Sequence, residues 1–223
     1  LSETPRLDLE LLLCHCLHKA RVYLYTWPER ELTEPQLANF EGLLERRLGG
    51  EPVAHLIGHR EFWNLSLAVD ASSLIPRPDS ELLVELALER APLGSVGRAL
   101  DLGTGTGALV LALASERPRW QLLGLDSSQA ALRLAERNRR ALGFETVVFI
   151  QSDWLEALDG KQRFDLILSN PPYIEPDDPH LEQGDLRFEP RSALVAGQEG
   201  LADIAHIVQT APGYLQPDGW LLI

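Results

Sequence analysis

Sulfur-containing residues are scarce in this chain of 223 residues. Two cysteines, Cys14 and Cys16, are too few for a disulfide framework, and they fit the reducing conditions of a cytoplasmic protein. Methionine is absent altogether, so no initiator residue is present. The chain also stops within an expected strand at residues 219–223, so we expect the natural protein to extend beyond both ends.

Basic residues are also in short supply. Lys and Arg total 20 against 33 Asp and Glu, which leaves a formal net charge of −13. Proteins that bind nucleic acids usually carry a basic face to neutralise phosphates, so we expect no nucleic-acid partner. No apolar run approaches the ~20 residues that a membrane span needs, and no signal peptide is evident, so no membrane association is expected.

The most informative stretch is Asn170-Pro171-Pro172-Tyr173. It follows residues 164–169, an apolar run with the pattern of a buried strand. Two prolines cannot continue a sheet ladder, and they stiffen the backbone where the strand ends. A planar NH2 group would fit there, because the Asn170 side-chain oxygen and the Pro171 carbonyl can accept its two hydrogens while Tyr173 packs on its face. A simple strand-terminating turn is the structural alternative.

A glycine loop gives the second signal. It reads Gly103-Thr104-Gly105-Thr106-Gly107 and lies between an expected strand at 98–102 and a small-residue helix. Glycines allow the backbone to turn tightly and to approach a ligand closely. Asp126 ends the next expected strand, where a carboxylate can accept both hydroxyls of a ribose.

Alternating strands and helices define the fold class. Strands are expected at 98–102, 121–125, 146–150, 164–168 and 219–223, with helices at 106–115, 128–142 and about 200–211. This order predicts an α/β fold with a parallel sheet and helices on both faces. The last strand is cut at Ile223, and we expect two further strands in the complete protein. A loop as long as 174–199 is usually functional.

We divide the chain into three parts. Residues 1–50 are expected to form a helical unit, and residues 51–76 a hairpin-like linker with two β-rich pieces, residues 61–67 being one of them. Residues 77–223 are expected to form the α/β domain. Asp79 is the expected N-cap of a helix that runs to Arg90. Cys14 and His18 share a helix face, but no second ligand pair is evident, so core packing is favoured and no metal site is expected.

These motifs carry a family resemblance. Asp101-Leu102-Gly103-Thr104-Gly105-Thr106-Gly107 resembles the first motif of class I S-adenosylmethionine-dependent methyltransferases, and residues 170–173 resemble their amino-methylating motif. Further stretches narrow the match: Ile75-Pro76-Arg77-Pro78-Asp79, Gln151-Ser152-Asp153-Trp154, Asp178-Pro179-His180-Leu181 and Arg187-Phe188-Glu189-Pro190. Together they resemble the HemK/PrmC family, the protein-glutamine N5-methyltransferases of peptide-chain release factors.

The resemblance implies a Rossmann-like class I methyltransferase sheet with a small N-terminal helical domain that docks the substrate. It implies S-adenosylmethionine as cofactor, S-adenosylhomocysteine as product, and class I release factors as protein partners of a monomeric enzyme. The glycine loop, Asp126 and Asn170 would hold the cofactor, with Asp153 and Trp154 at its adenine. For Trp154 a core position is the alternative, and Asp101 either orients the loop or the cofactor's ammonium group or is a purely structural turn acid.

Other functions remain open from the sequence. Gly103-x-Gly105-x-x-Ala108 fits the loose dinucleotide pattern of a dehydrogenase, which has no evident use for Asn170-Pro171-Pro172-Tyr173. A methyltransferase acting on an exocyclic amine of a nucleic-acid base, or on a glutamine of a ribosomal protein, is the closer alternative. A non-catalytic binding module would leave the convergent motifs without a purpose.

Overall fold

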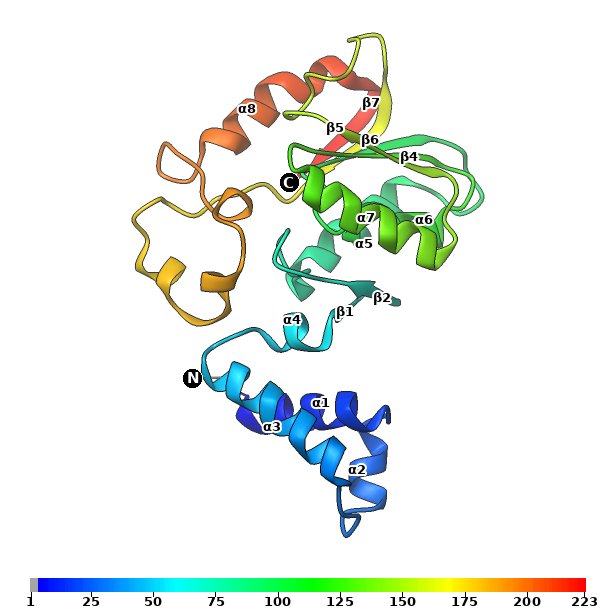
Figure 1. Ribbon diagram of the computed structural model, residues 1–223. Coiled ribbons are helices and arrows are strands. Elements are labelled where there is room, and N and C mark those ends of the chain that lie inside the picture. Colours follow the sequence, from blue (N-terminus) through cyan, green and yellow to red (C-terminus); the bar gives the residue numbers. More distant parts are fainter. Residues whose placement is uncertain (1–3) are drawn as a thin grey trace. The chain divides into compact units, whose positions relative to one another are not determined.

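The computed structural model describes residues 4–223, so the first three residues of the expected helical unit lie outside it. The chain forms two compact units. One runs to Gly58 and also includes residues 179–188, and the other comprises residues 59–178 and 189–223 (Figure 1). The chain thus leaves the larger unit within the long loop and returns to it, whereas the sequence division had placed that whole loop in one domain.

The smaller unit is helical. Its helices are α1 (Pro5–Leu17), α2 (Val22–Thr26), α3 (Glu34–Leu48) and α4 (Val53–Ile57). Leu12, Cys16, Leu43 and Leu56 pack together as its core, and burial of these apolar side chains is what holds the short helices together. The Gln36 side chain accepts the Thr33 N–H at 3.0 Å, as in a capping box, and thereby starts α3.

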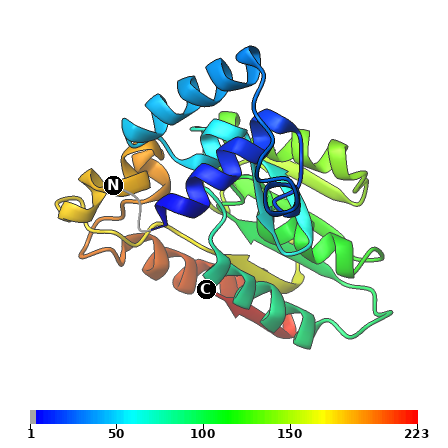
Figure 2. The same ribbon diagram turned by 90° about the horizontal axis from the view of Figure 1, so that it is seen from below.

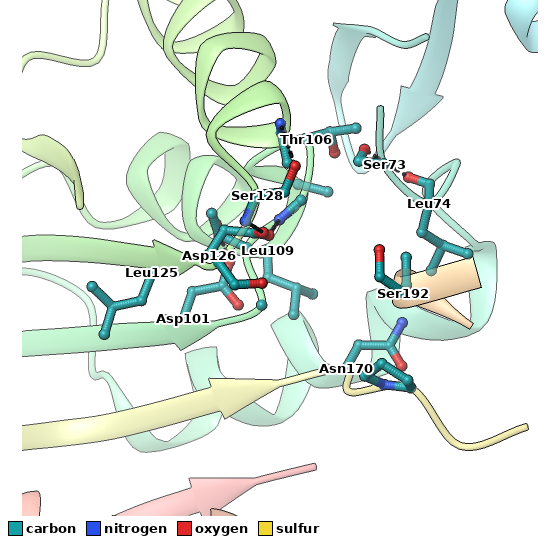
Figure 3. A pocket seen from close by; sticks show the side chains of 18 of the residues that line it. Ser73, Leu74, Asp101, Thr106, Leu109, Leu125, Asp126, Ser128, Asn170 and Ser192 are labelled. Carbon is teal, nitrogen blue, oxygen red and sulfur yellow. Dashed lines mark hydrogen bonds between the residues drawn. The ribbon is translucent and has the colours of Figure 1, made fainter. Parts of the chain in front are cut away.

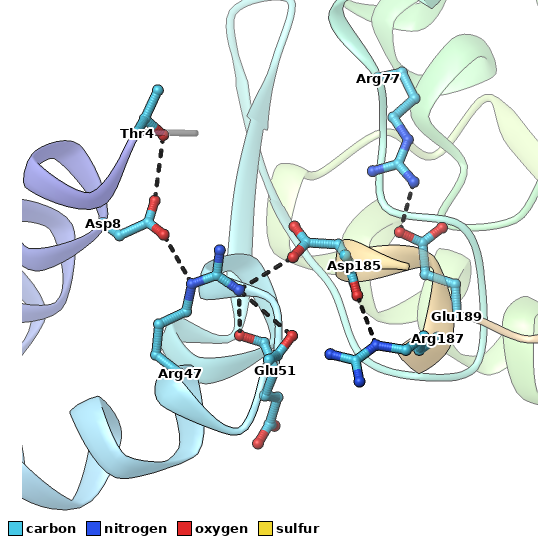
Figure 4. Close-up of polar contacts among 10 residues, drawn as sticks. Thr4, Asp8, Arg47, Glu51, Arg77, Asp185, Arg187 and Glu189 are labelled. Carbon is cyan, nitrogen blue, oxygen red and sulfur yellow. Dashed lines mark hydrogen bonds and ion pairs between the residues drawn. The ribbon is translucent and has the colours of Figure 1, made fainter. Parts of the chain in front are cut away.

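Arg47 at the end of α3 attaches the loop segment 179–188 to this unit. Its guanidinium lies 2.7 Å from an Asp8 carboxylate oxygen and 3.1 Å from one of Asp185, and it donates to the Glu51 carbonyl at 3.0 Å (Figure 4). The segment itself forms two short 3-10 turns, η2 (Pro179–Glu182) and η3 (Gly184–Phe188). The loop is therefore ordered by a polar contact that periodicity cannot reveal.

The larger unit begins with a hairpin of β1 (His59–Phe62) and β2 (Leu65–Ala68). A hairpin is therefore present as expected, but the expected β-rich piece at 61–67 is divided between its two strands, because the chain reverses at Trp63, whose φ is +56°. The Trp63 N–H donates to Glu81 at 2.7 Å, and its indole N–H donates to Glu116 at 2.9 Å. These bonds hold the turn of the hairpin on the following helices.

A parallel sheet of five strands forms the centre of this unit. The strands lie in the order β5 (Val147–Gln151), β4 (Gln121–Asp126), β3 (Arg98–Leu102), β6 (Phe164–Ser169) and β7 (Leu215–Leu222). The chain builds outward from β3 to β5 and then returns to add β6 on the other side of β3. Open sheets bind ligands outside the carboxyl ends of their strands at such a switch point, which here lies between β3 and β6.

Helices cover both faces of the sheet (Figures 1 and 2). The helices α5 (Glu81–Arg90), α6 (Ala108–Glu116) and α7 (Gln129–Leu142) lie on one face, and α8 (Ala202–Thr210) lies on the other. Neighbouring residues of β3 belong to different hydrophobic cores on the two faces of the sheet. Ala99 packs in the same core as Val84 and Val110, whereas Leu100 packs in the core that contains Ile207. This alternation within a two-sided sheet confirms the expected α/β class.

Some element boundaries differ from the expectation. Asp79 is not the N-cap of α5, because a 3-10 turn, η1 (Pro78–Ser80), comes first and Ser80 takes that place. Strand β7 starts at Leu215, four residues before the expected strand. None of the helices within residues 4–223 is long and apolar enough to cross a membrane.

Candidate active site

A cavity of about 270 Å³ lies at the carboxyl edge of the sheet in the larger unit (Figure 3). Residues that follow β3, β4, β5 and β6 all contribute to its lining, as does the segment after β2. The sequence-predicted site residues that line it are Gly103, Thr104, Gly105, Thr106, Asp126, Asp153, Trp154, Asn170 and Pro172. Among the described residues, Gly107, Pro171 and Tyr173 are the predicted ones outside the lining.

The glycine loop turns back on the neighbouring strand. The N–H groups of Gly103 and Thr104 both donate to the Leu125 carbonyl at 2.9 Å. Gly103 and Gly105 have φ values of +71° and +55°, in the left-handed region that glycine adopts at low cost. The loop therefore leaves room for a ligand beside its backbone.

Asp126 joins this loop to the end of β4. One carboxylate oxygen accepts the Gly105 N–H at 2.9 Å, and the other accepts the Ser128 N–H at 2.8 Å. Burial raises the pKa of Asp126 above its usual value, and the two backbone donors act in the opposite direction. The carboxylate faces the cavity while it holds the loop in place (Figure 3).

Asp101 lies under the loop at the end of β3 and is 1% exposed. One carboxylate oxygen accepts the Thr104 hydroxyl at 2.7 Å, and the other, Oδ1, is buried with no hydrogen-bond partner among the described residues. Burial raises its pKa to about 7, the Thr104 hydrogen bond opposes the rise, and the charge of Asp126 adds to it. An acid with an unsatisfied buried oxygen beside a cavity suits a cationic ligand group.

Trp154 and Asp153 follow β5. The Trp154 ring lies against Gly103, where a Cβ added to the glycine would stand 3.7 Å from the ring, and Trp154 has a φ of +43°. The ring is partly buried against the core on the α8 face of the sheet, yet it also lines the cavity. The position of Trp154 is thus compatible both with a ring beside the adenine and with a tryptophan of the core. Asp153, the preceding residue, is exposed.

Asn170 stands at the carboxyl end of β6 with its side chain directed into the cavity (Figure 3). Its Nδ2 donates to the Ser80 hydroxyl at 3.3 Å, so its Oδ1 is the atom left to accept from a ligand. Pro171 is buried, whereas the Tyr173 side chain is 63% exposed. The motif thus divides into an inward part at Asn170 and an outward aromatic ring.

Several lining residues were not singled out from the sequence: Ser73, Leu74, Ser80, Ser192 and Asp203. They come from the segment after the hairpin, from the turn before α5 and from the loop and helix after β6. A serine in a turn or loop has no sequence pattern that marks it as a site residue. Arg77 also lines the cavity and pairs with Glu189 at 2.6 Å, with the Glu189 side chain fully buried (Figure 4). The ion pair therefore holds Arg77 at the cavity.

Asn138 of α7 links two of the segments that form the cavity. Its Oδ1 accepts the Ala68 N–H at 2.8 Å, and its Nδ2 donates to the Ala68 carbonyl at 3.1 Å and to the Thr106 carbonyl at 2.9 Å. One buried amide thus joins the end of the hairpin to the glycine loop. We did not find it from the sequence, because its three partners are backbone groups far away in the chain.

Comparisons with known proteins agree with this geometry. The PrmC N-terminal domain family matches residues 1–58, and a methyltransferase domain family matches residues 94–223. Release factor glutamine methyltransferases are similar over the whole chain: that of Shewanella oneidensis is 53% identical over 100% of this chain and 77% of its own length, and that of Vibrio cholerae is 55% identical over 99% and 77%. A solved methyltransferase structure from Pyrococcus furiosus has a TM-score of 0.51 at 19% identity, covering 82% of this chain and 78% of its own, and shows the shared fold. The chain therefore belongs to the family of release factor glutamine methyltransferases.

Proposed function

We propose that this protein transfers a methyl group from S-adenosylmethionine to the side-chain amide nitrogen of the glutamine in the Gly-Gly-Gln loop of class I release factors. The single observation that carries the proposal is one cavity lined both by the glycine loop after β3 and by Asn170 after β6. A donor and an acceptor can meet there. The relatives, at 53% and 55% identity, supply the choice of acceptor.

The residues present fit S-adenosylmethionine. Asp101 offers a buried oxygen without a partner, which suits the cofactor's ammonium group. Asp126 faces the cavity at the end of β4, where its carboxylate can accept ribose hydroxyls, and Trp154 offers a ring for the adenine. When bound, the cofactor supplies an electrophilic methyl group on a sulfonium sulfur, and it leaves as S-adenosylhomocysteine.

On the acceptor side, Asn170 has the main role. Because its Nδ2 donates to Ser80, its Oδ1 can accept one hydrogen of the glutamine NH2. The Pro171 carbonyl is the proposed acceptor for the second hydrogen. An amide nitrogen is a poor nucleophile, since its lone pair is delocalised, so a fixed aim at the methyl group within ~3–3.5 Å is the main contribution the protein makes.

No strong general base is required. The nitrogen forms its bond to the methyl carbon while the carbon–sulfur bond breaks, and the electron pair of that bond stays on sulfur. The methylated amide is then very acidic, so its proton passes to water. The residues that line the cavity therefore need only to accept hydrogen bonds from the substrate amide nitrogen.

Four acceptors, two proteins and two nucleic acids, test the proposal. Purified protein and tritiated S-adenosylmethionine are incubated with a class I release factor, with the same factor whose loop glutamine is changed to alanine, and with duplex DNA and ribosomal RNA. Label is expected in the first acceptor alone. Equal labelling of both release factors would place the methyl group elsewhere, and label in nucleic acid alone would establish a base amine as the substrate.

The proposed protein substrate also implies a cellular location and an oligomeric state. A release factor is a protein of the translation machinery, so a cytoplasmic location belongs to the same proposal, as do the absence of a nucleic-acid partner and a monomeric enzyme. The net charge of −13 supports a protein acceptor rather than nucleic acid. Sedimentation of the purified protein with and without the release factor would measure the monomer and the complex directly.

A further inference from the structure

The two ends of the long loop after the Asn170-Pro171-Pro172-Tyr173 motif are hydrogen-bonded to each other. The Ile174 N–H donates to the Leu194 carbonyl at 2.9 Å, and the Ala196 N–H donates to the Ile174 carbonyl at 2.9 Å. Ile174 and Val195 form a parallel bridge. The returning end of the loop is therefore paired with the residue that follows the motif.

Gly200 makes a second contact with the motif, directly from backbone to backbone. Its φ is +77°, and a Cβ built at this position would lie 2.2 Å from the Tyr173 carbonyl oxygen and 3.0 Å from the carbonyl carbon. Such distances are far below van der Waals contact. Any side chain at residue 200 would push the Tyr173 backbone aside, because a carbonyl group cannot rotate away like the end of a flexible side chain.

We propose that Gly200 and residues 194–196, here called the brace, are positioning residues that hold the Asn170-Pro171-Pro172-Tyr173 backbone for methyl transfer. The brace acts through Tyr173, and Gly200 itself is outside the described cavity lining. The inference rests on the proposed function, which makes Asn170 the residue that aims the substrate amide.

Proline stiffness explains why the position of Tyr173 matters at Asn170. The rings of Pro171 and Pro172 fix φ at both positions, so the segment has few soft torsions with which to absorb a displacement. A shift of the Tyr173 carbonyl is therefore passed back to Asn170. A misplacement of ~1 Å at a reacting group can cost on the order of 100-fold in rate.

Glycines elsewhere in the same unit provide matched controls. Gly160 has a φ of +72° with no atom within 4 Å of a built Cβ, and Gly197 has only the Ala202 Cβ, at 4.0 Å. Gly160→Ala therefore introduces the backbone strain without the collision. Gly197→Ala introduces a methyl group into the returning end of the loop without backbone strain and without a collision.

The experiment compares these three variants with the wild type. Methyl transfer to the release factor gives kcat and KM, and calorimetry with S-adenosylhomocysteine gives the cofactor Kd and the fraction of competent protein. We expect Gly200→Ala to lower kcat/KM by on the order of 100-fold while the cofactor Kd stays within about twofold. Gly160→Ala and Gly197→Ala are expected to transfer methyl groups at nearly the wild-type rate.

Two outcomes would overturn the proposal. One is transfer by Gly200→Ala as fast as by Gly197→Ala, and the other is a parallel loss of cofactor binding, which marks a general folding defect. Failure of the wild type to methylate the release factor would instead refute the proposed function.

Hydrogen exchange on the wild type provides a test that needs no variant. The amides of Ile174 and Ala196 should exchange much more slowly than that of the exposed residue Glu199, because both are hydrogen-bonded across the base of the loop. Equal exchange rates would show that the brace does not exist in solution.

Discussion

Asp101 offers the sharpest test of how the site recognises its methyl donor. In the free protein its carboxyl group is buried, keeps one oxygen without a partner and has a pKa of about 7, well above the ordinary 3.8. An ammonium group placed against that oxygen favours the ionised form and lowers the pKa again. Binding should therefore expel the proton that the free protein still holds.

The size of the effect follows from the pKa. With a free-state pKa of about 7, Asp101 is mostly protonated well below pH 7 and mostly ionised well above it. Provided that the pKa in the complex falls well below this range, binding should release close to one proton per ligand at the acid end and almost none at the alkaline end. Because the ionised form binds, affinity should rise as the pH increases through 7 and then level off.

Calorimetry with S-adenosylhomocysteine in buffers of different ionisation enthalpy measures this release directly. Asp101→Asn should abolish it, whereas Asp153→Asn, which removes an exposed carboxylate from the same cavity, should leave it unchanged. Identical proton release by the wild type and by Asp101→Asn would refute the assignment of Asp101 to the ammonium group. It would leave Asp101 as a structural acid under the loop.

Four further substitutions test the site and the fold. Asn170→Ala should lower turnover by roughly 100-fold, as expected for loss of one positioned transition-state hydrogen bond, and a near-normal kcat would contradict the role given to Oδ1. Asp126→Ala should weaken S-adenosylmethionine binding by ~1.5–3 kcal/mol in calorimetry, and unchanged affinity in a folded variant would remove Asp126 from the site. Gly124→Ala should destabilise the protein by about 1–3 kcal/mol in urea unfolding, because its Cβ would lie 2.7 Å from the Phe149 ring. Gly42→Ala, within α3 and with no atom within 4 Å of its Cβ, should instead be neutral or stabilise by up to ~1 kcal/mol.

Regular elements with strong patterns could be predicted from the sequence. Strand β3 has the expected bounds, and α7 ends at Gly143, whose φ of +74° suits a helix C-terminus. Short elements could not be predicted, because α2 and α4 span five residues each and a single turn shows no period. The expected start of α5 is wrong because a 3-10 turn at Pro78–Ser80 precedes the helix, which begins at Glu81.

The candidate site shows the same division. Its backbone-defined parts could be located, because a glycine loop and a pair of prolines leave a trace in the local sequence. The residues that join distant segments at the site could not be predicted. Ser80 is hydrogen-bonded to Asn170, 90 residues away in the chain, and Asn138 to Ala68, 70 residues away. Such contacts depend on tertiary packing, about which a single sequence carries no direct information.

The strand order has a consequence for synthesis on the ribosome. Strands β3, β4 and β5 emerge in succession and lie side by side, whereas β6 must insert beside β3 after a separation of about 67 residues. Translation is vectorial, so residues 164–169 of β6 leave the ribosome after β3, β4 and β5. The second edge of β3 therefore stays unpaired until β6 has been made, and the cavity cannot be complete until Asn170 has emerged, however early the glycine loop and Asp126 appear.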